Sequence, residues 1–211
     1  MPPRLDKKRL FVKENKFFAF STKAGSFLAV QALLGKTPDT AAFFSPHILA
    51  SIMIDAYDKL KESFDRVCVL ESPHIPKRIL NKAIYDEMPS VRAAAIRSSK
   101  VDTKLLKIGI KDKNLLVRRE VILSKLATKD LYDIGIKDRS FQVREAVIKK
   151  TEHLEHLDAG ISDPHEKVRL ATVVSNLATI FHLEKAVLDD NPIIQDLAEH
   201  KLRAITQRKH S

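Results

Sequence analysis

The chain has 211 residues, a formal net charge of +10, and only five glycines and nine prolines. This length is enough for a substantial core, and so few glycines favour a mostly helical chain over a loop-rich all-β protein. The single cysteine, Cys68, excludes an intramolecular disulfide and predicts a cytoplasmic or other reducing intracellular compartment. A membrane span would need about 18 consecutive apolar residues, which the chain lacks, and its charged N-terminus does not fit a secretory signal.

Residues 1–44 are predicted to form a basic, Phe-rich N-terminal arm and helical cap. They hold eight Lys and Arg against three Asp and Glu, interleaved with phenylalanines. Basic side chains between aromatic rings can grip a single nucleic-acid strand, but a repeat array also needs a cap over its first apolar face. The pattern of residues 25–34 is typical of an amphipathic helix and favours the cap. Residues 1–9 and 203–211 are predicted to be mobile basic arms.

Residues 45–206 contain an internal repeat. Successive Asp residues lie 26, 26, 25 and 26 positions apart, and each is followed five residues later by a branched aliphatic residue. In the first four copies Arg comes directly after that aliphatic residue. The recurring pairs are Asp86 and Arg92, Asp112 and Arg118, Asp138 and Arg144, and Asp163 and Arg169; Asp189 and Gln195 follow in the last copy. A repeat this short cannot bury its own apolar face, so neighbouring repeats must stack.

Each repeat is predicted to contain two short helices joined by tight turns. Apolar residues before every Asp recur with the spacing of a buried helical stripe. A small residue stands three positions before each Asp, where we expect it to let the backbone of the next repeat approach closely. The small residues are Ala83, Gly109, Gly135, Gly160 and Ala186. The second helix is expected to begin at the Asp as its N-cap. About six repeats are predicted over 45–206, followed by a basic tail at 207–211.

The repeat resembles the leucine-rich repeat variant and is similar to short HEAT-like repeats. The resemblance rests on the Val-Arg pair after Asp, the aliphatic helix, the turn with Pro or Ser, and the Leu-Leu before the next Asp, and it covers residues 72–202. It implies an all-α fold, a right-handed α-solenoid of about six short two-helix units with an N-terminal helical cap, whose concave face holds a ligand. These families include protein adaptors and HEAT-like DNA glycosylases that bind duplex in a basic groove. The variant protein with an iron–sulfur cluster uses a group of cysteines that this chain lacks.

The recurring arginines allow two interpretations. Four guanidinium groups could follow a phosphate backbone. Alternatively, each Arg could bind the Asp of its own or the adjacent repeat and hold the stack together. Because Asp and Arg recur together, we favour the structural interpretation of this ladder.

Basic residues outside the recurring frame are better candidates for binding nucleic acid. Residues 59–150 hold 22 basic and 12 acidic side chains, whereas residues 151–200 hold three basic and ten acidic. This asymmetry exceeds what solubility requires, although a solubilising surface is the simpler alternative. Two successive turns carry paired cations beside Asp112 and Asp138, and three lysines share one helical face. The candidates are Lys77, Arg78, Lys82, Lys104, Lys107, Lys111, Lys113, Arg119, Lys137 and Arg139.

Motifs for catalysis are missing from the sequence. It contains no Gly-rich phosphate loop, nucleophile elbow or paired cysteine ligands, so we predict no catalytic residue and no cofactor. His153, His156 and His182 could cluster at a zinc site, but such histidines more often cover a helical face. The helical-repeat glycosylases use an acidic residue and aromatic residues, typically Trp, in the groove, and this chain has no Trp.

The sequence therefore predicts a non-catalytic binding protein for an acidic macromolecule, with nucleic acid preferred. The competing class is a protein–protein adaptor or scaffold whose acidic end docks a basic partner, and a DNA glycosylase is a minor alternative. The acidic end consists of Glu152, Glu155, Asp158, Asp163 and Glu166. No membrane partner is predicted.

Overall fold

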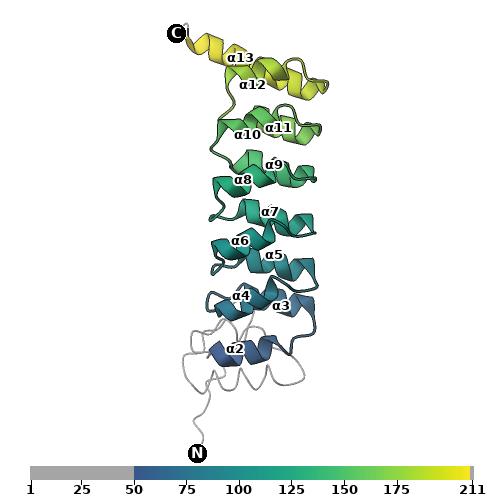
Figure 1. Cartoon of the computed structure of the whole chain (residues 1–211). Coiled ribbons are helices and arrows are strands. Elements are labelled where there is room, and N and C mark those ends of the chain that lie inside the picture. The colour runs from purple at the N-terminus through teal and green to yellow at the C-terminus, as the bar shows by residue number, and fades with distance from the viewer. Residues whose placement is uncertain (1–49, 210–211) are drawn as a thin grey trace, which may run out of the picture. The chain divides into compact units, whose positions relative to one another are not determined.

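A computed structural model describes residues 50–209, and the predicted arm and cap at 1–44 lie outside them (Figure 1). Within residues 50–209 all regular secondary structure is α-helical, which confirms the all-α prediction. The described chain falls into two compact parts, an N-terminal unit ending at Gly109 and a C-terminal unit beginning at Ile110.

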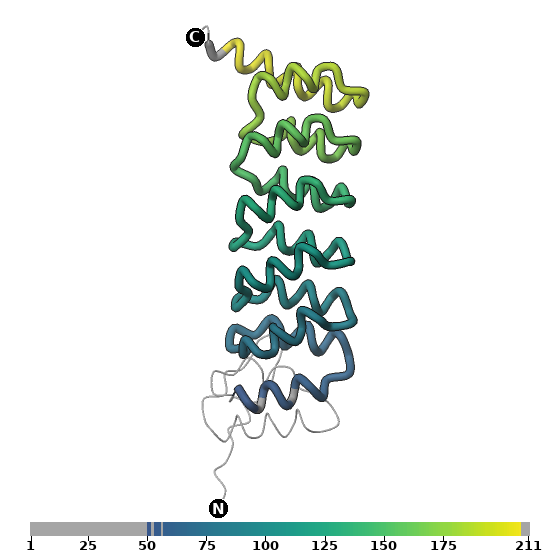
Figure 2. Tube along the Cα trace, viewed as in Figure 1, coloured from purple at the N-terminus to yellow at the C-terminus, as the bar shows by residue number. Residues whose placement is uncertain are grey.

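From α4 onward, helices of seven residues alternate with longer ones, and the helices follow one another as Figures 1 and 2 show. The N-terminal unit contains α2 (Ala50–Tyr57), α3 (Ser63–Leu70), α4 (Lys77–Ala83), α5 (Pro89–Arg97) and α6 (Thr103–Gly109). The C-terminal unit contains α7 (Leu115–Leu123), α8 (Lys129–Gly135), α9 (Phe141–Lys150), α10 (Leu154–Gly160), α11 (Glu166–Val174), α12 (Ile180–Ala186) and α13 (Pro192–Lys209). We call α4, α6, α8, α10 and α12 the A helices, and α5, α7, α9, α11 and α13 the B helices. This alternation confirms the predicted pairs of short helices.

The recurring Asp closes the turn between an A helix and the following B helix. Oδ1 of Asp138 accepts a hydrogen bond from the backbone N–H of Ser140 at 2.8 Å, and Oδ1 of Asp163 accepts one from His165 at 2.8 Å. The N-cap residues are Ser140 for α9 and His165 for α11, so the prediction that Asp is the N-cap is wrong. The reason is that Asp forms an Asx turn and lies two residues before the N-cap.

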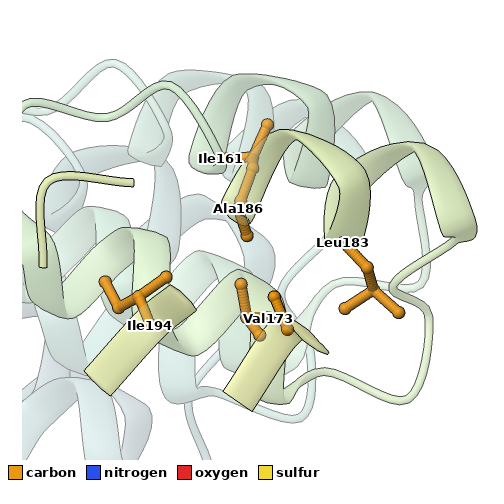
Figure 3. Packing of buried hydrophobic residues seen from close by; sticks show 6 residues of the cluster. Ile161, Val173, Leu183, Ala186 and Ile194 are labelled. Carbon is orange, nitrogen blue, oxygen red and sulfur yellow. The ribbon is translucent and has the colours of Figure 1, made fainter. Parts of the chain in front are cut away.

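Successive helices bury their apolar side chains against one another. Beyond α10, the cluster in Figure 3 combines Ile161 with Val173 of α11, Leu183 and Ala186 of α12, and Ile194 of α13. All of these side chains are buried. Because the cluster draws on three consecutive helices, no single helix pair encloses it. The repeats therefore stabilise one another by stacking, as a helical-repeat architecture requires.

The last helix runs further than the sequence indicated. Helix α13 continues to Lys209, so residues 203–209 are helical instead of forming a mobile arm. Leu202 and Ile205 pack against the cluster shown in Figure 3, which gives this extension an apolar anchor.

The small residue at the end of an A helix makes room for side chains. A Cβ at Gly135 would lie 2.6 Å from Cδ1 of Ile122 and 2.7 Å from Cγ2 of Val147, which belong to the two flanking B helices. The expected close approach thus involves side chains, not the backbone of the next repeat. Where the A helix ends in Ala186, the position equivalent to Val147 holds Ala198. A smaller residue at the end of the A helix is thus accompanied by a larger residue at the facing position of the B helix, and a larger one by a smaller.

This exchange predicts a coupled pair of substitutions. Gly135→Ala should destabilise the protein, because overlap with Ile122 and Val147 outweighs the gain of about 1 kcal/mol that Ala normally brings to a helix. Val147→Ala should cost on the order of 2 kcal/mol through the cavity that it leaves. In the double variant the new methyl group fills part of that cavity. Urea denaturation of the four proteins should therefore give a favourable coupling of about 1 kcal/mol, and strictly additive losses would contradict the packing.

Candidate functional site

One guanidinium group holds two successive A–B turns together in the C-terminal unit. Nε and Nη2 of Arg118 donate to Oδ2 and Oδ1 of Asp138 at 2.6 and 2.8 Å. Nη1 donates to the backbone oxygens of Asp112 and Lys113 at 2.9 and 3.1 Å. The side chains of Arg118 and Asp138 are only 7% and 8% exposed. The bond is therefore bidentate, charge-assisted and largely shielded from water.

The same arrangement recurs at the later repeats. Arg144 donates from Nε and Nη2 to Asp163 at 2.5 and 2.8 Å, and Arg169 donates in the same way to Asp189 at 2.7 and 2.9 Å. In each case Nη1 also bonds the backbone oxygen of the Asp in the arginine's own repeat. Where the last copy has Gln195, its side-chain amide donates to the backbone oxygen of Asp189.

The N-terminal unit contains related contacts. Nε of Arg66 lies 3.0 Å from Oδ2 of Asp86, and Nη1 of Arg92 donates to the backbone oxygen of Asp86 at 2.7 Å. Arg66 stands one repeat before Arg92 in the sequence and pairs with the following Asp as Arg118 does in the other unit, but it donates one hydrogen bond to that carboxylate, from Nη2 at 3.2 Å.

Pairing favours the ionised forms of both partners. The hydrogen bonds to Asp138 raise the pKa of the Arg118 guanidinium above its usual value. Burial alone would raise the pKa of Asp138, but the bonds from Arg118 and the Ser140 amide outweigh it and hold that pKa below its usual value. The guanidinium groups of Arg118, Arg144 and Arg169 are already engaged by carboxylate and backbone oxygens. These contacts favour the structural interpretation of the ladder over phosphate binding.

The candidate cations of the N-terminal unit lie on its A helices. Lys77 and Lys82 of α4 are paired with Asp102 and Asp58 at 2.5 and 2.6 Å. The remaining three are exposed, and within residues 50–209 no carboxylate pairs with them. They are Arg78 of α4 and Lys104 and Lys107 of α6.

The candidate cations of the C-terminal unit gather at two successive turns. We call Lys111, Lys113, Lys137 and Arg139 the basic turn edge; all four are exposed. Nη2 of Arg139 donates to the backbone oxygen of Lys113 at 2.8 Å, which links the two turns from outside while Arg118 links them from within. No carboxylate of the described chain pairs with these four side chains. Arg119 is also exposed but lies on α7.

Two buried histidines link successive A helices. Nε2 of His156 lies 2.7 Å from Oδ1 of Asp133, and Nε2 of His182 lies 3.0 Å from Oδ1 of Asp158. Nδ1 of His182 accepts the Thr179 backbone N–H at 3.0 Å, so Nε2 carries the proton that Asp158 accepts. Sequence reasoning missed these links. The available signal was that His156 and His182 occupy the repeat position that Leu131 holds. In both cases an Asp stands 23 or 24 positions earlier in the sequence.

The predicted histidine cluster is only partly assembled. The rings of His153 and His156 meet edge-on with their centroids 5.7 Å apart, whereas His182 bonds Thr179 and Asp158. Among residues 50–209 no group of three or more His, Cys, Asp and Glu side chains is arranged to hold a metal ion.

Most carboxylates of the predicted acidic end are engaged within the fold. Glu155 pairs with Lys129 at 3.1 Å, and Glu166 accepts a hydrogen bond from Asn191 at 2.6 Å. Asp158 and Asp163 bond a histidine and a ladder arginine, as described above. Glu152 is exposed. A docking surface made of these five residues would therefore have to displace internal bonds.

The fold and contacts define an all-α helical-repeat protein, and such arrays offer extended binding surfaces. No protein-family model matches the chain, and no curated protein matches it. Among solved structures it is similar to a leucine-rich repeat variant with a novel repetitive protein structural motif. The two are 19% identical, the match covers 82% of this chain and 80% of the other, and the TM-score is 0.46. Within residues 50–209 no helix has the length and apolar character needed to cross a bilayer.

Two adjacent arginines on α7 give a matched test of the ladder. Arg118→Met should lower the free energy of unfolding by about 3–5 kcal/mol, because it leaves the Asp138 carboxylate buried without its countercharge. Arg119→Met, at an exposed position, should change it by less than about 0.5 kcal/mol. Urea denaturation at neutral pH measures both. Similar, small effects of the two substitutions would show that the Arg118–Asp138 pair does not hold the turns together.

Proposed function

We propose that this chain is a non-catalytic helical-repeat protein that binds nucleic acid through the basic turn edge. The observation that carries this proposal is the contrast at the two turns around Asp112 and Asp138. Arg118 is engaged inside the fold, whereas Lys111, Lys113, Lys137 and Arg139 are exposed and have no carboxylate partner in the described chain. Lysine and arginine side chains in this state can neutralise phosphates and release the counterions of a nucleic acid.

The basic turn edge is also held in place before any ligand binds. Asx turns close both connections, through the Asn114 and Ser140 amides at 2.8 Å each. Arg118 and Arg139 then fix one turn to the other. Since the backbone that carries the cations is ordered in advance, binding loses less conformational entropy. Three further exposed cations, Arg78, Lys104 and Lys107 of the N-terminal unit, have no carboxylate partner within residues 50–209. We also place the protein in a reducing intracellular compartment, as its single cysteine suggests.

A protein–protein adaptor is the competing function. An acidic protein could use the same cations, whereas docking of a basic partner on the acidic end has less support, because four of its five carboxylates are bonded within the fold. A DNA glycosylase is a minor alternative that would require the purified protein to release a modified base. If the purified protein leaves the modified base attached, the glycosylase alternative is excluded.

Charge reversal at the basic turn edge tests the proposal. Lys111→Glu with Lys137→Glu should weaken binding of an oligonucleotide at least tenfold at low salt and make the plot of log affinity against log salt shallower by about 2. The matched control reverses Lys125, two residues beyond α7, and Lys150, the last residue of α9; both are exposed and lack a carboxylate partner in the described range. It changes the net charge equally and should retain most of the affinity. Fluorescence anisotropy across a salt series measures all three proteins.

Equal loss of affinity in both double variants would show that net charge, rather than the basic turn edge, determines binding. Absence of binding by the unmodified protein at low salt would remove the nucleic-acid proposal and favour the adaptor.

A further inference from the structure

A groove with a volume of about 420 Å³ lies between α4 and α6 in the N-terminal unit. Ile84 and Leu105, both 2% exposed, contribute apolar surface to it. Its lining also includes Tyr85, which is 71% exposed, and the partly exposed Ile108. This volume lies within the range of about 300–1,000 Å³ that is usual for small-molecule sites. The groove thus combines an apolar floor with an aromatic ring that has little cover from the protein.

The charges around this groove favour an anionic ligand. The one carboxylate in its lining, Asp102, pairs with Lys77 at 2.5 Å and accepts the backbone N–H of Leu105 at 3.0 Å. Lys104 also lines the groove, and no carboxylate within residues 50–209 pairs with it. One uncompensated positive charge therefore remains in the lining of the groove.

The corresponding place in the C-terminal unit is bridged by the protein's own side chains. Between α8 and α10, His156 bonds Asp133, and Lys129 pairs with both Asp133 and Glu155. At the repeat positions of Asp133 and His156 the N-terminal unit has Asn81 and Leu105, which both line the groove. A neutral amide and a leucine cannot form that ionic link. The sequence therefore leaves this groove without the His–Asp bond that joins α8 to α10, and the Lys77–Asp102 pair is the ionic contact in its lining.

The repeat architecture does not require an aromatic side chain at the position of Tyr85. The equivalent positions in the later repeats hold Lys111, Lys137, Ser162 and Leu188. The local contact of residue 85 is made by its backbone N–H, which donates to the backbone oxygen of Lys82 at 3.0 Å. An exposed aromatic ring in a groove that a cation also lines, at a position that the later repeats fill with unrelated side chains, points to binding rather than stability.

We propose that this groove binds a base of single-stranded nucleic acid, with Tyr85 as the stacking surface and Lys104 as the phosphate partner. Arg78 and Lys107 lie on the same two helices and can neutralise neighbouring phosphates. An aromatic ring stacks on any unpaired base, whereas bases in a duplex are already stacked on one another and paired. The inference rests on the proposed function and adds to it a preference for unpaired strands.

Tyrosine fluorescence gives a direct readout, because the chain has three tyrosines and no tryptophan. Stacking of a base on Tyr85 should quench the emission when an oligothymidylate of about 12 nucleotides is added, a length within known single-strand site sizes. Tyr85→Phe should remove most of this quenching and keep the affinity. Tyr85→Ala should lose the quenching and weaken binding by about 5- to 150-fold, as measured by anisotropy of a labelled strand.

A strand of the same length in which every nucleotide lacks its base separates stacking from charge. The unmodified protein should bind the strand with bases more tightly, and Tyr85→Ala should remove most of that difference. Equal weakening for both strands, or unchanged affinity in Tyr85→Ala, would overturn the inference. Polyglutamate that competes as well as the oligothymidylate would overturn it too, in favour of an acidic protein.

The inference and the proposed function can fail separately. If binding depends on Lys111 and Lys137 but not on Tyr85, the stacking site is wrong and the basic turn edge stands. If the protein binds neither strand nor a duplex at low salt, both are wrong. Thermal unfolding of Tyr85→Ala should match the unmodified protein within about 2 °C, since the side chain is mostly exposed.

Discussion

The bidentate bond from Arg118 to Asp138 is the interaction on which the neighbouring repeats of this protein depend. Removing both charges from water is costly, and a buried ion pair stabilises a fold only when its remaining hydrogen-bonding groups are also satisfied. Here the remaining hydrogen-bonding groups of both Arg118 and Asp138 have partners. Arg118 bonds two backbone oxygens of the preceding turn, and Asp138 accepts the amide that precedes its own B helix. One pair of side chains therefore fixes the spacing of two turns and the start of the next helix.

This use of arginine also determines which cations remain available to a partner. The ladder arginines donate inward to carboxylate and backbone oxygens, while Lys111, Lys113 and Lys137 project from the same turns without carboxylate partners in the described chain. The residues that we propose for binding are thus direct neighbours of the residues that hold the turns together. A planar guanidinium with a rigid fork of donors suits the fixed bidentate bonds of the ladder.

The sequence predicted the repeat and its helix pairs, because a period of about 26 residues and a helical apolar stripe are visible without coordinates. It placed the N-cap wrongly, since a pattern of residue types does not distinguish an Asx turn from a cap two residues later. It identified the cations of the basic turn edge, but not that Lys77 and Lys82 are paired with Asp102 and Asp58. The His156–Asp133 link and the groove beside Tyr85 arise from the register between successive A helices. That register depends on the length of each turn and is not visible within one repeat.

Hydrogen exchange of the turn amides is the most direct test of the claim that the Arg–Asp ladder makes these turns rigid. The amides of Ser140, His165 and Asn191 each donate to an Asp carboxylate whose other bonds come from a ladder arginine. We predict that they exchange as slowly as amides inside the B helices, because opening a turn requires breaking the buried ion pair. Exchange at the rate of exposed loop amides would contradict the account. The turns would then be locally mobile, and their cations would not be held in place for a ligand.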